Sequence, residues 1–108
     1  MKKLEDKSDK NHDVVLFGYD KVSFETINTL EKLKKKYLIV DYNPEVTRYV
    51  EERDIDCIYG DAGNVELLDE VIKPDTKMVI SSTREIESNM LILKKAKHFN
   101  KDCIVITT

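Results

Sequence analysis

Short apolar runs alternate along the chain with longer segments in which apolar residues recur at helical spacing. The runs are continuous, which is typical of strands that are covered on both faces in a parallel sheet. Several of them end at a glycine or an aspartate, residue types that turn the chain. We therefore predict five strands, at residues 14–17, 37–40, 57–59, 78–80 and 103–106.

The segments between these runs predict helices. In residues 20–36, apolar side chains recur at helical spacing, and Phe24 lies on the flank of the stripe formed by Val22, Ile27, Leu30 and Leu33. Lys34, Lys35 and Lys36 are expected to crowd the final turn, where positive charge complements the helix dipole. This explanation is favoured over phosphate binding by the three lysines.

The other helices are predicted at residues 43–53, 64–72 and 86–97. Asn43 is a favoured capping residue, and Pro44 follows it at the first helical position. In the last helix, Leu91, Ile92 and Ala96 are expected to face inward. Pro74 breaks the third helix before the fourth strand begins.

The alternation of strand and helix predicts a Rossmann-like, doubly wound, three-layer α/β domain with a parallel sheet. The probable strand order of such a sheet is 3-2-1-4-5. Residues 1–13 are dense in charge and lack periodicity, so they are expected to form a lead-in or linker, and residues 14–108 the domain.

Composition excludes several classes of protein. The formal net charge of −3, spread along 108 residues, leaves no basic footprint for nucleic acid. No apolar run reaches the roughly 20 residues that span a bilayer. Cys57 and Cys103 lie in apolar runs and are expected to be buried free thiols. Strand order 3-2-1-4-5 would place them too far apart for a disulfide.

Ligands bind such sheets beyond the carboxyl ends of the strands, which directs attention to four loops, at residues 18–23, 41–43, 60–63 and 81–84. Gly18 keeps the first glycine of a G-x-G-x-x-G fingerprint, whereas Asp20 and Ser23 replace the other two. Ser23 is small enough for close helix packing. Asp20 places a negative charge where phosphates would lie, and it is expected to cap the following helix and fill the anion site itself. Lys21 either offsets this charge or is solvated.

Asp41 ends the second predicted strand, 23 residues after Gly18. The fingerprint expects an acidic residue near this position to accept a hydrogen bond from a ribose hydroxyl. An aspartate before Asn-Pro is equally suited to a turn. The spacing leaves both roles open.

Four segments in order resemble the RCK or TrkA-N domain. VVLFGYDKVS stands where that family has a strand followed by GYGRVG, and LIVDYNPE resembles its second strand and helix start. IYGDAGN resembles its third strand and GDA-type loop, and MVISSTREIESNMLILKKAK its fourth strand and long helix. The resemblance covers residues 13–108. The family domain continues through another helix and a sixth strand, so we expect a chain that lacks this sixth strand.

This resemblance implies a cytoplasmic regulatory domain that pairs with a second copy at the inner face of the cell membrane. Its partner would be a potassium channel, a potassium uptake system or a cation/proton antiporter. The cofactor implied is NAD(H) or an adenine nucleotide (AMP, ADP or ATP). The candidate cofactor-binding residues are Gly18, Tyr19, Asp20, Lys21, Val22, Ser23, Asp41, Tyr42, Asp61, Ala62, Ser82 and Thr83.

Two alternatives follow from the same residues. If Asp20 has displaced phosphate, the chain is a dimerisation or assembly domain that has lost nucleotide binding. A dehydrogenase-like enzyme would need groups suited to proton transfer. His12, in the lead-in, and His98, at a helix end, are both expected to be solvated, so catalysis is not expected, and no metal site is predicted.

Overall fold

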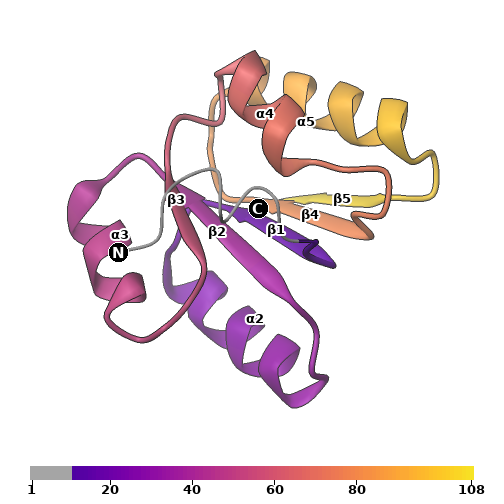
Figure 1. Ribbon diagram of the computed structural model, residues 1–108. Helices are drawn as coiled ribbons and strands as arrows, with labels where there is room; N and C mark the ends of the chain where they lie inside the picture. Colours follow the sequence, from indigo (N-terminus) through magenta and orange to yellow (C-terminus); the bar gives the residue numbers. More distant parts are fainter. Residues whose placement is uncertain (1–10) are drawn as a thin grey trace.

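The computed structural model describes residues 11–108, apart from the side chains of Lys21 and Val22. Five parallel strands form one sheet in the order β3-β2-β1-β4-β5 (Figure 1). The order 3-2-1-4-5 predicted from the alternation is thus confirmed. The strands are β1 (Val14–Phe17), β2 (Tyr37–Asp41), β3 (Cys57–Tyr59), β4 (Met78–Ser81) and β5 (Ile104–Thr107).

Within residues 11–108, four helices cover the sheet. Two lie on each face (Figure 1). Helices α2 (Lys21–Lys32) and α3 (Pro44–Glu51) pack on one face, and α4 (Val65–Val71) and α5 (Ile86–Phe99) on the other. Each face has its own buried cluster, one containing Leu16, Ile27, Ile39 and Val50, and the other containing Phe17, Leu38, Leu68 and Ile92. This is the doubly wound, three-layer arrangement that the apolar pattern predicted.

β1 is the central strand, which explains its continuous apolar sequence. Leu16 pairs with Ile39 of β2 on one side and with Ile80 of β4 on the other. All four residues of β1 are buried. Because neighbouring side chains point to opposite faces, a strand covered by helices on both faces needs an apolar residue at every position.

Helix α2 ends earlier than the sequence indicated. The helix stops at Lys32, and Lys34 takes a left-handed conformation with φ of 57°. The Lys34 N–H donates to the Glu31 carbonyl at 3.1 Å, and the Lys35 N–H donates to the Leu30 carbonyl at 2.9 Å. These two bonds form a Schellman motif, which closes a helix. The prediction that Lys34–Lys36 form the last helical turn was therefore wrong.

Leu33 and His12 also differ from expectation. Leu33 lies just beyond the helix and is exposed, not inward-facing. His12, expected to be solvated, is buried, and its Nε2 lies 2.9 Å from Asp56 Oδ2. His12 is buried because the backbone of the next residue is fixed on both sides. The Asp13 N–H donates to the Lys36 carbonyl, and the Asp13 carbonyl accepts from the Lys77 N–H. The chain is thus already fixed to the sheet before β1 begins. Residues 1–10 of the predicted lead-in lie outside the described part of the chain.

The two cysteines are free and buried, as expected. Cys57 opens β3, whereas Cys103, predicted as the first residue of the fifth strand, lies one residue before β5. β3 and β5 are the two edges of the sheet, so a disulfide between these positions is excluded. Among residues 11–108, no helix has the length and apolar character needed to cross a bilayer.

Candidate functional site

The carboxyl ends of β1, β2, β3 and β4 open on one pocket of about 740 Å³. Loops far apart in the sequence meet there, as the parallel topology requires. Ser23 does not line this pocket and is buried beneath it, while the side chains of Lys21 and Val22 lie outside what the structure describes. The predicted residues that do line it are Gly18, Tyr19, Asp20, Asp41, Tyr42, Asp61, Ala62, Ser82 and Thr83.

Gly18 allows the chain to turn out of β1 close to β4. Its φ is +96°, a conformation that L side chains rarely adopt. A Cβ at this position would overlap the Ser82 hydroxyl. That hydroxyl donates to the Phe17 carbonyl at 3.1 Å, and the Gly18 N–H donates to the Val40 carbonyl at 2.8 Å. The loop is thereby held between the ends of β2 and β4.

Asp20 caps helix α2, as its sequence position indicated. Its Oδ1 accepts a hydrogen bond from the Ser23 N–H at 3.0 Å and another from the Ser23 hydroxyl at 3.1 Å. The same hydroxyl also lies 3.1 Å from the Gly18 carbonyl. Ser23 therefore fills the close-packing position of the fingerprint and supports the carboxylate at the same time. The positive end of the α2 dipole faces a negative charge from the chain itself.

Asp41 takes the turn role that the sequence left open, and it also lines the pocket. Its Oδ1 accepts from the Asn43 N–H at 2.8 Å, which shapes the turn into α3. Its Oδ2 accepts from the Tyr19 N–H at 3.0 Å, which ties the loop after β1 to the end of β2. A carboxylate oxygen has two acceptor positions, so each oxygen retains capacity for a further donor such as a ribose hydroxyl.

The loop after β3 is a compact turn held by Asp61. Its Oδ1 accepts from the Gly63 N–H at 2.9 Å, and its carbonyl accepts from the Asn64 N–H at 3.0 Å. Asn64 then caps α4 by accepting from the Leu67 N–H. These bonds fix the direction of the turn and keep Ala62 at the pocket wall.

The loop after β4 closes the far side of the pocket and is anchored by Asn89. The Asn89 amide donates to the Thr83 carbonyl at 3.0 Å, and Ser81 Oγ lies 2.7 Å from Asn89 Oδ1. This loop leads directly into α5, whose N-terminal boundary residue is Glu85. Since Glu85 also lines the pocket, the pocket and α5 share a residue.

Several lining residues were absent from the predicted site. Arg84 belongs to the predicted loop 81–84 but was not assigned to the ligand site, and Glu85 is the next residue along the chain. Asn43 belongs to the predicted loop 41–43 but was assigned only the role of a helix cap, and Pro44 was recognised only as a helix-start residue. Val46 reaches the pocket from the first turn of α3, and nothing in its sequence context distinguishes it from a core residue.

The pocket is acidic. The ionisable carboxylates that line it are Asp20, Asp41, Asp61 and Glu85, and the one cation among the described lining side chains is Arg84. Arg84 is exposed, so solvent screens its charge. In this respect the pocket differs from an ordinary phosphate site, in which backbone N–H groups and basic side chains face the anion.

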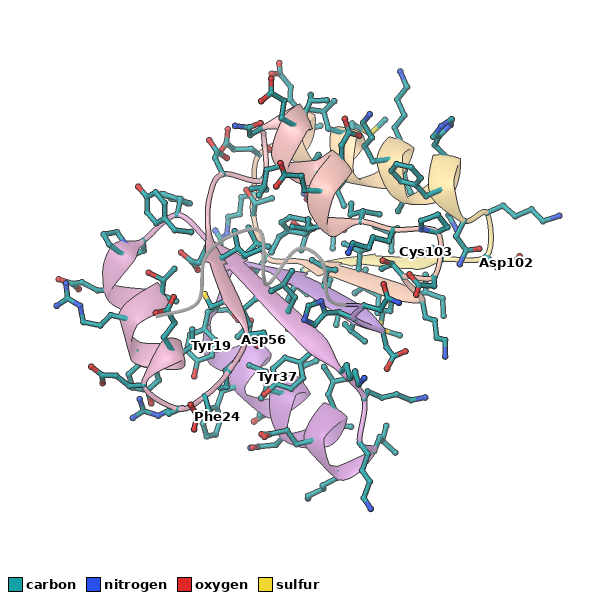
Figure 2. All side chains as sticks on the ribbon, viewed as in Figure 1. Tyr19, Phe24, Tyr37, Asp56, Asp102 and Cys103 are labelled. Atoms are coloured by element: carbon teal, nitrogen blue, oxygen red, sulfur yellow. The ribbon has the colours of Figure 1, made fainter. Side chains whose placement is uncertain are left out.

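A larger cavity of about 830 Å³ lies at the amino ends of the strands, where Asp56 and Tyr37 are labelled in Figure 2. Burial raises the pKa of Tyr37 to about 12, with the charges of Glu31 and Asp56 adding to the effect. None of the predicted site residues lines this cavity. Within the described residues, no group of three or more His, Cys, Asp or Glu side chains is placed to hold a metal ion.

A doubly wound parallel sheet with a pocket beyond its strand ends defines a Rossmann-like α/β domain. The family model of the TrkA-N domain matches residues 14–108, and the chain belongs to this family. The resemblance drawn from the four sequence segments is confirmed. Comparison with curated proteins gives no significant match.

Solved structures share the fold at low sequence identity. The TrkA-N domain of the inner membrane protein YbaL from Escherichia coli superposes with a TM-score of 0.77 at 20% identity, covering 92% of this chain and 73% of that one. The NAD(P)-binding domain of an exopolyphosphatase-related protein from Archaeoglobus fulgidus gives 0.74 at 20% identity, covering 90% and 72%. The GsuK channel bound to NAD gives 0.74 at 17% identity, covering 92% of this chain and 18% of the channel.

These neighbours are mostly TrkA-N or RCK domains of membrane proteins, but the fold also occurs in an enzyme. ChuY, an anaerobilin reductase from Escherichia coli, gives a TM-score of 0.66 at 16% identity, covering 87% of this chain and 48% of that one. The fold therefore does not decide the function, which has to be inferred from the residues of the pocket.

Proposed function

We propose that this chain is a cytoplasmic regulatory domain of a potassium channel, potassium uptake system or cation/proton antiporter, and that it binds the adenosine part of NAD(H) or of AMP, ADP or ATP. The observation that carries the proposal is the pocket at the strand ends, in which the four predicted loops converge. Two further observations support it: membership of the TrkA-N family, and the existence of GsuK structures bound to NAD and to ADP.

In this proposal each wall of the pocket contacts a different part of the ligand. The free acceptor positions of Asp41 receive the ribose hydroxyls, with the exposed ring of Tyr42 at the rim. Asp61 and Ala62 flank the base. Ser82 and Thr83 close the far side, and the loop 18–23 lies toward the 5′ end of the ribose.

Isothermal titration with NADH, NAD, AMP, ADP and ATP tests the binding half of the proposal. We expect micromolar binding of at least one compound, and its loss in Asp41→Ala, because the ribose then has no acceptor. Asp75→Asn is the matched control, since Asp75 is exposed and lines none of the pockets described. The absence of heat with all five compounds would contradict it.

One observation favours a second candidate, an assembly domain without nucleotide. Asp20 already occupies the α2 N-terminus, where a phosphate would bind. Asp20→Asn separates the two candidates, because asparagine caps a helix about as well as aspartate but carries no charge. If the wild type binds nothing and this variant binds AMP, the assembly function is the correct one.

The surface of α5 supports pairing of two copies. Ile86, Met90 and Leu93 are exposed at spacings of four and three residues, and they form an apolar stripe that borders a shallow cavity of about 630 Å³. Glu87 lies beside one end of this α5 stripe, and Lys94 and Lys97 lie toward the other. If two α5 helices pack antiparallel about a two-fold axis, Glu87 of each copy faces lysines of the other.

Control of transport then follows from how the two copies pack. A ligand shifts such an equilibrium only if it binds the two arrangements with different affinity. The domain acts at the inner face of the cell membrane through an attached or associated transporter. Potassium-uptake rates of cells carrying the full reading frame, compared with the Asp41→Ala form, test this part. Equal rates at all potassium concentrations would exclude control through the pocket.

No catalytic role is proposed. His12 is buried at the other end of the sheet, His98 is exposed at the end of α5, and neither lines the pocket. Turnover of a nicotinamide cofactor by the isolated chain would overturn this assignment.

A further inference from the structure

We infer that the preferred ligand of the pocket at the strand ends is a ribonucleoside that carries no phosphate at its 5′ carbon, with a neutral or positively charged group there instead. The inference rests on the proposed function, because it concerns the same pocket and the same adenosine part of the ligand, and it ranks a ligand without phosphate above the nucleotides named there. Three observations lead to it: the use of backbone donors, the charge of the lining, and the groups that remain for a ligand.

The first observation concerns the backbone donors of the loop after β1. In a dinucleotide site, N–H groups of this loop and of the helix start face the pyrophosphate. Here the Tyr19 N–H donates to Asp41, and the Ser23 N–H donates to Asp20, each at 3.0 Å. Two donors from this segment are thus already bound to carboxylates of the chain. A phosphate would have to displace both carboxylates from good hydrogen bonds before it could use them.

The second observation is the charge that a phosphate would meet. Asp20 lies at the loop where the 5′ group would be placed, and Asp41, Asp61 and Glu85 line the same pocket. Like charges in a partly enclosed site repel more strongly than they do in bulk water. Asp20, Asp61, Glu85 and Arg84 are all exposed, so solvent screens them alike, but the lining carries four carboxylates against one described cation. The repulsion grows with each phosphate added to the ligand.

The third observation is that the remaining groups suit a nucleoside. Asp41 keeps acceptor capacity for ribose hydroxyls, and carboxylates make strong hydrogen bonds to such donors. Pro44, Val46 and Ala62 supply apolar wall for a base. The pocket, at about 740 Å³, lies within the usual size of small-molecule sites and needs no pyrophosphate to fill it.

A series of adenine compounds of graded charge tests the inference. S-adenosylmethionine, adenosine, AMP, ADP and ATP share the base and ribose but differ in the charge of the 5′ group. Titration calorimetry at low salt should show adenosine and S-adenosylmethionine binding at least about tenfold more tightly than ADP. Raising the salt from about 0.05 M to about 0.5 M should reduce the ratio of the adenosine affinity to the ADP affinity, because screening weakens the repulsion between phosphate and carboxylates.

Two matched variants identify the charge that is responsible. Asp20→Asn keeps the helix cap and removes the carboxylate nearest the 5′ group. It should therefore lower the ratio of the adenosine affinity to the ADP affinity by about threefold or more. Asp75→Asn removes one charge outside the pocket and should leave the ratio unchanged. Circular dichroism of each variant confirms that the fold is retained.

The outcomes separate the inference from the proposed function. If ADP or ATP binds the wild type more tightly than adenosine, the inference is wrong and the proposed function stands. If no compound of the series binds the wild type or Asp20→Asn, both are wrong. If the preference for adenosine is present but does not change in Asp20→Asn or with salt, charge does not select the ligand and the inference is overturned.

Discussion

Two features of position 18 require glycine, its positive φ and its closeness to the Ser82 hydroxyl. A double-mutant experiment distinguishes them. Gly18→Ala places a Cβ at a φ of +96°, which costs about 1 kcal/mol, and drives it into the Ser82 hydroxyl. Moving that hydroxyl breaks its bond to the Phe17 carbonyl, which costs about 1 kcal/mol more. We expect urea unfolding to show a loss of about 2 kcal/mol in the free energy of unfolding.

Ser82→Ala alone should lower the free energy of unfolding by about 1 kcal/mol, because it removes the same hydrogen bond. In the Gly18→Ala background, where that bond is already lost, it should cost nothing further. Strict additivity of the two losses would show that the serine hydroxyl does not restrict Gly18, and that the backbone conformation alone requires glycine.

Asp13 gives the stability of the fold a dependence on pH. Its carboxylate accepts from the Lys36 N–H at 3.1 Å, and this hydrogen bond, with Lys77 and Lys35 nearby, holds the pKa below its ordinary value of 3.8 against the effect of burial. A depressed pKa in the folded state stabilises the fold above about pH 4, and this contribution is lost as the pH falls through the folded-state pKa.

Asp13→Asn should therefore be less stable than the wild type at pH 7, by roughly 0.5–1 kcal/mol, and the difference should shrink below about pH 4. Urea unfolding between pH 3 and pH 7 measures this difference in the free energy of unfolding. In the control Asp75→Asn, the difference from the wild type should not shrink at low pH. A difference that stays constant over this range would show that the carboxylate charge contributes nothing.

The residues that could be predicted from the sequence are those whose role depends on local chemistry. Asp20 and Asn43 cap the helices that follow them, and a capping residue bonds to backbone two or three positions along the chain. His12 was misjudged because its partner, Asp56, is 44 positions away. Asp41 could be placed at the pocket but its bond to Tyr19 could not, because that bond depends on the distance between two loops.

At the scale of elements, the end of α2 shows how a helix can stop without glycine. Lys34 holds a left-handed conformation that glycine adopts at no steric cost. Lys34→Gly should raise the free energy of unfolding by roughly 0.5–1 kcal/mol, the relief of backbone strain less the entropy that glycine loses. Thermal unfolding measures the gain.

Lys35→Gly provides the comparison for this substitution. Lys35 is equally exposed but does not have a positive φ, so glycine should bring no gain there. A fall in stability in Lys34→Gly would mean that the lysine side chain contributes more than its backbone conformation costs.

The same motif explains why strands were predicted better than helix ends. A central strand that is covered on both faces must be apolar throughout, and β1 falls where the pattern placed it. The Schellman bonds that end α2 are made by backbone groups, which every residue except proline carries. With a lysine in the left-handed position, the sequence contained no sign that the helix had ended.

At the scale of the whole molecule, the pocket and the α5 stripe are joined through the loop after β4. Glu85 lines the pocket, and Ile86, the first residue of α5, begins the stripe. In the proposed dimer, a ligand bound against Glu85 would restrict the start of α5, so a second copy that packs there would lose less entropy. Ligand binding and pairing should therefore strengthen each other by the same factor.

Met90→Lys tests this coupling, because Met90 is 59% exposed and lies in the middle of the stripe. Since Met90 is exposed, a lysine there leaves the monomer fold intact. In an antiparallel pair of α5 helices it brings two like charges together. Sedimentation should therefore show a dimer for the wild type and a monomer for the variant. Adenosine should bind the variant at least about fivefold more weakly, the lower end of ordinary allosteric coupling. Lys101→Met, remote from the stripe, should change neither measurement. Equal adenosine affinity in dimer and monomer would mean that the pocket does not sense pairing through α5.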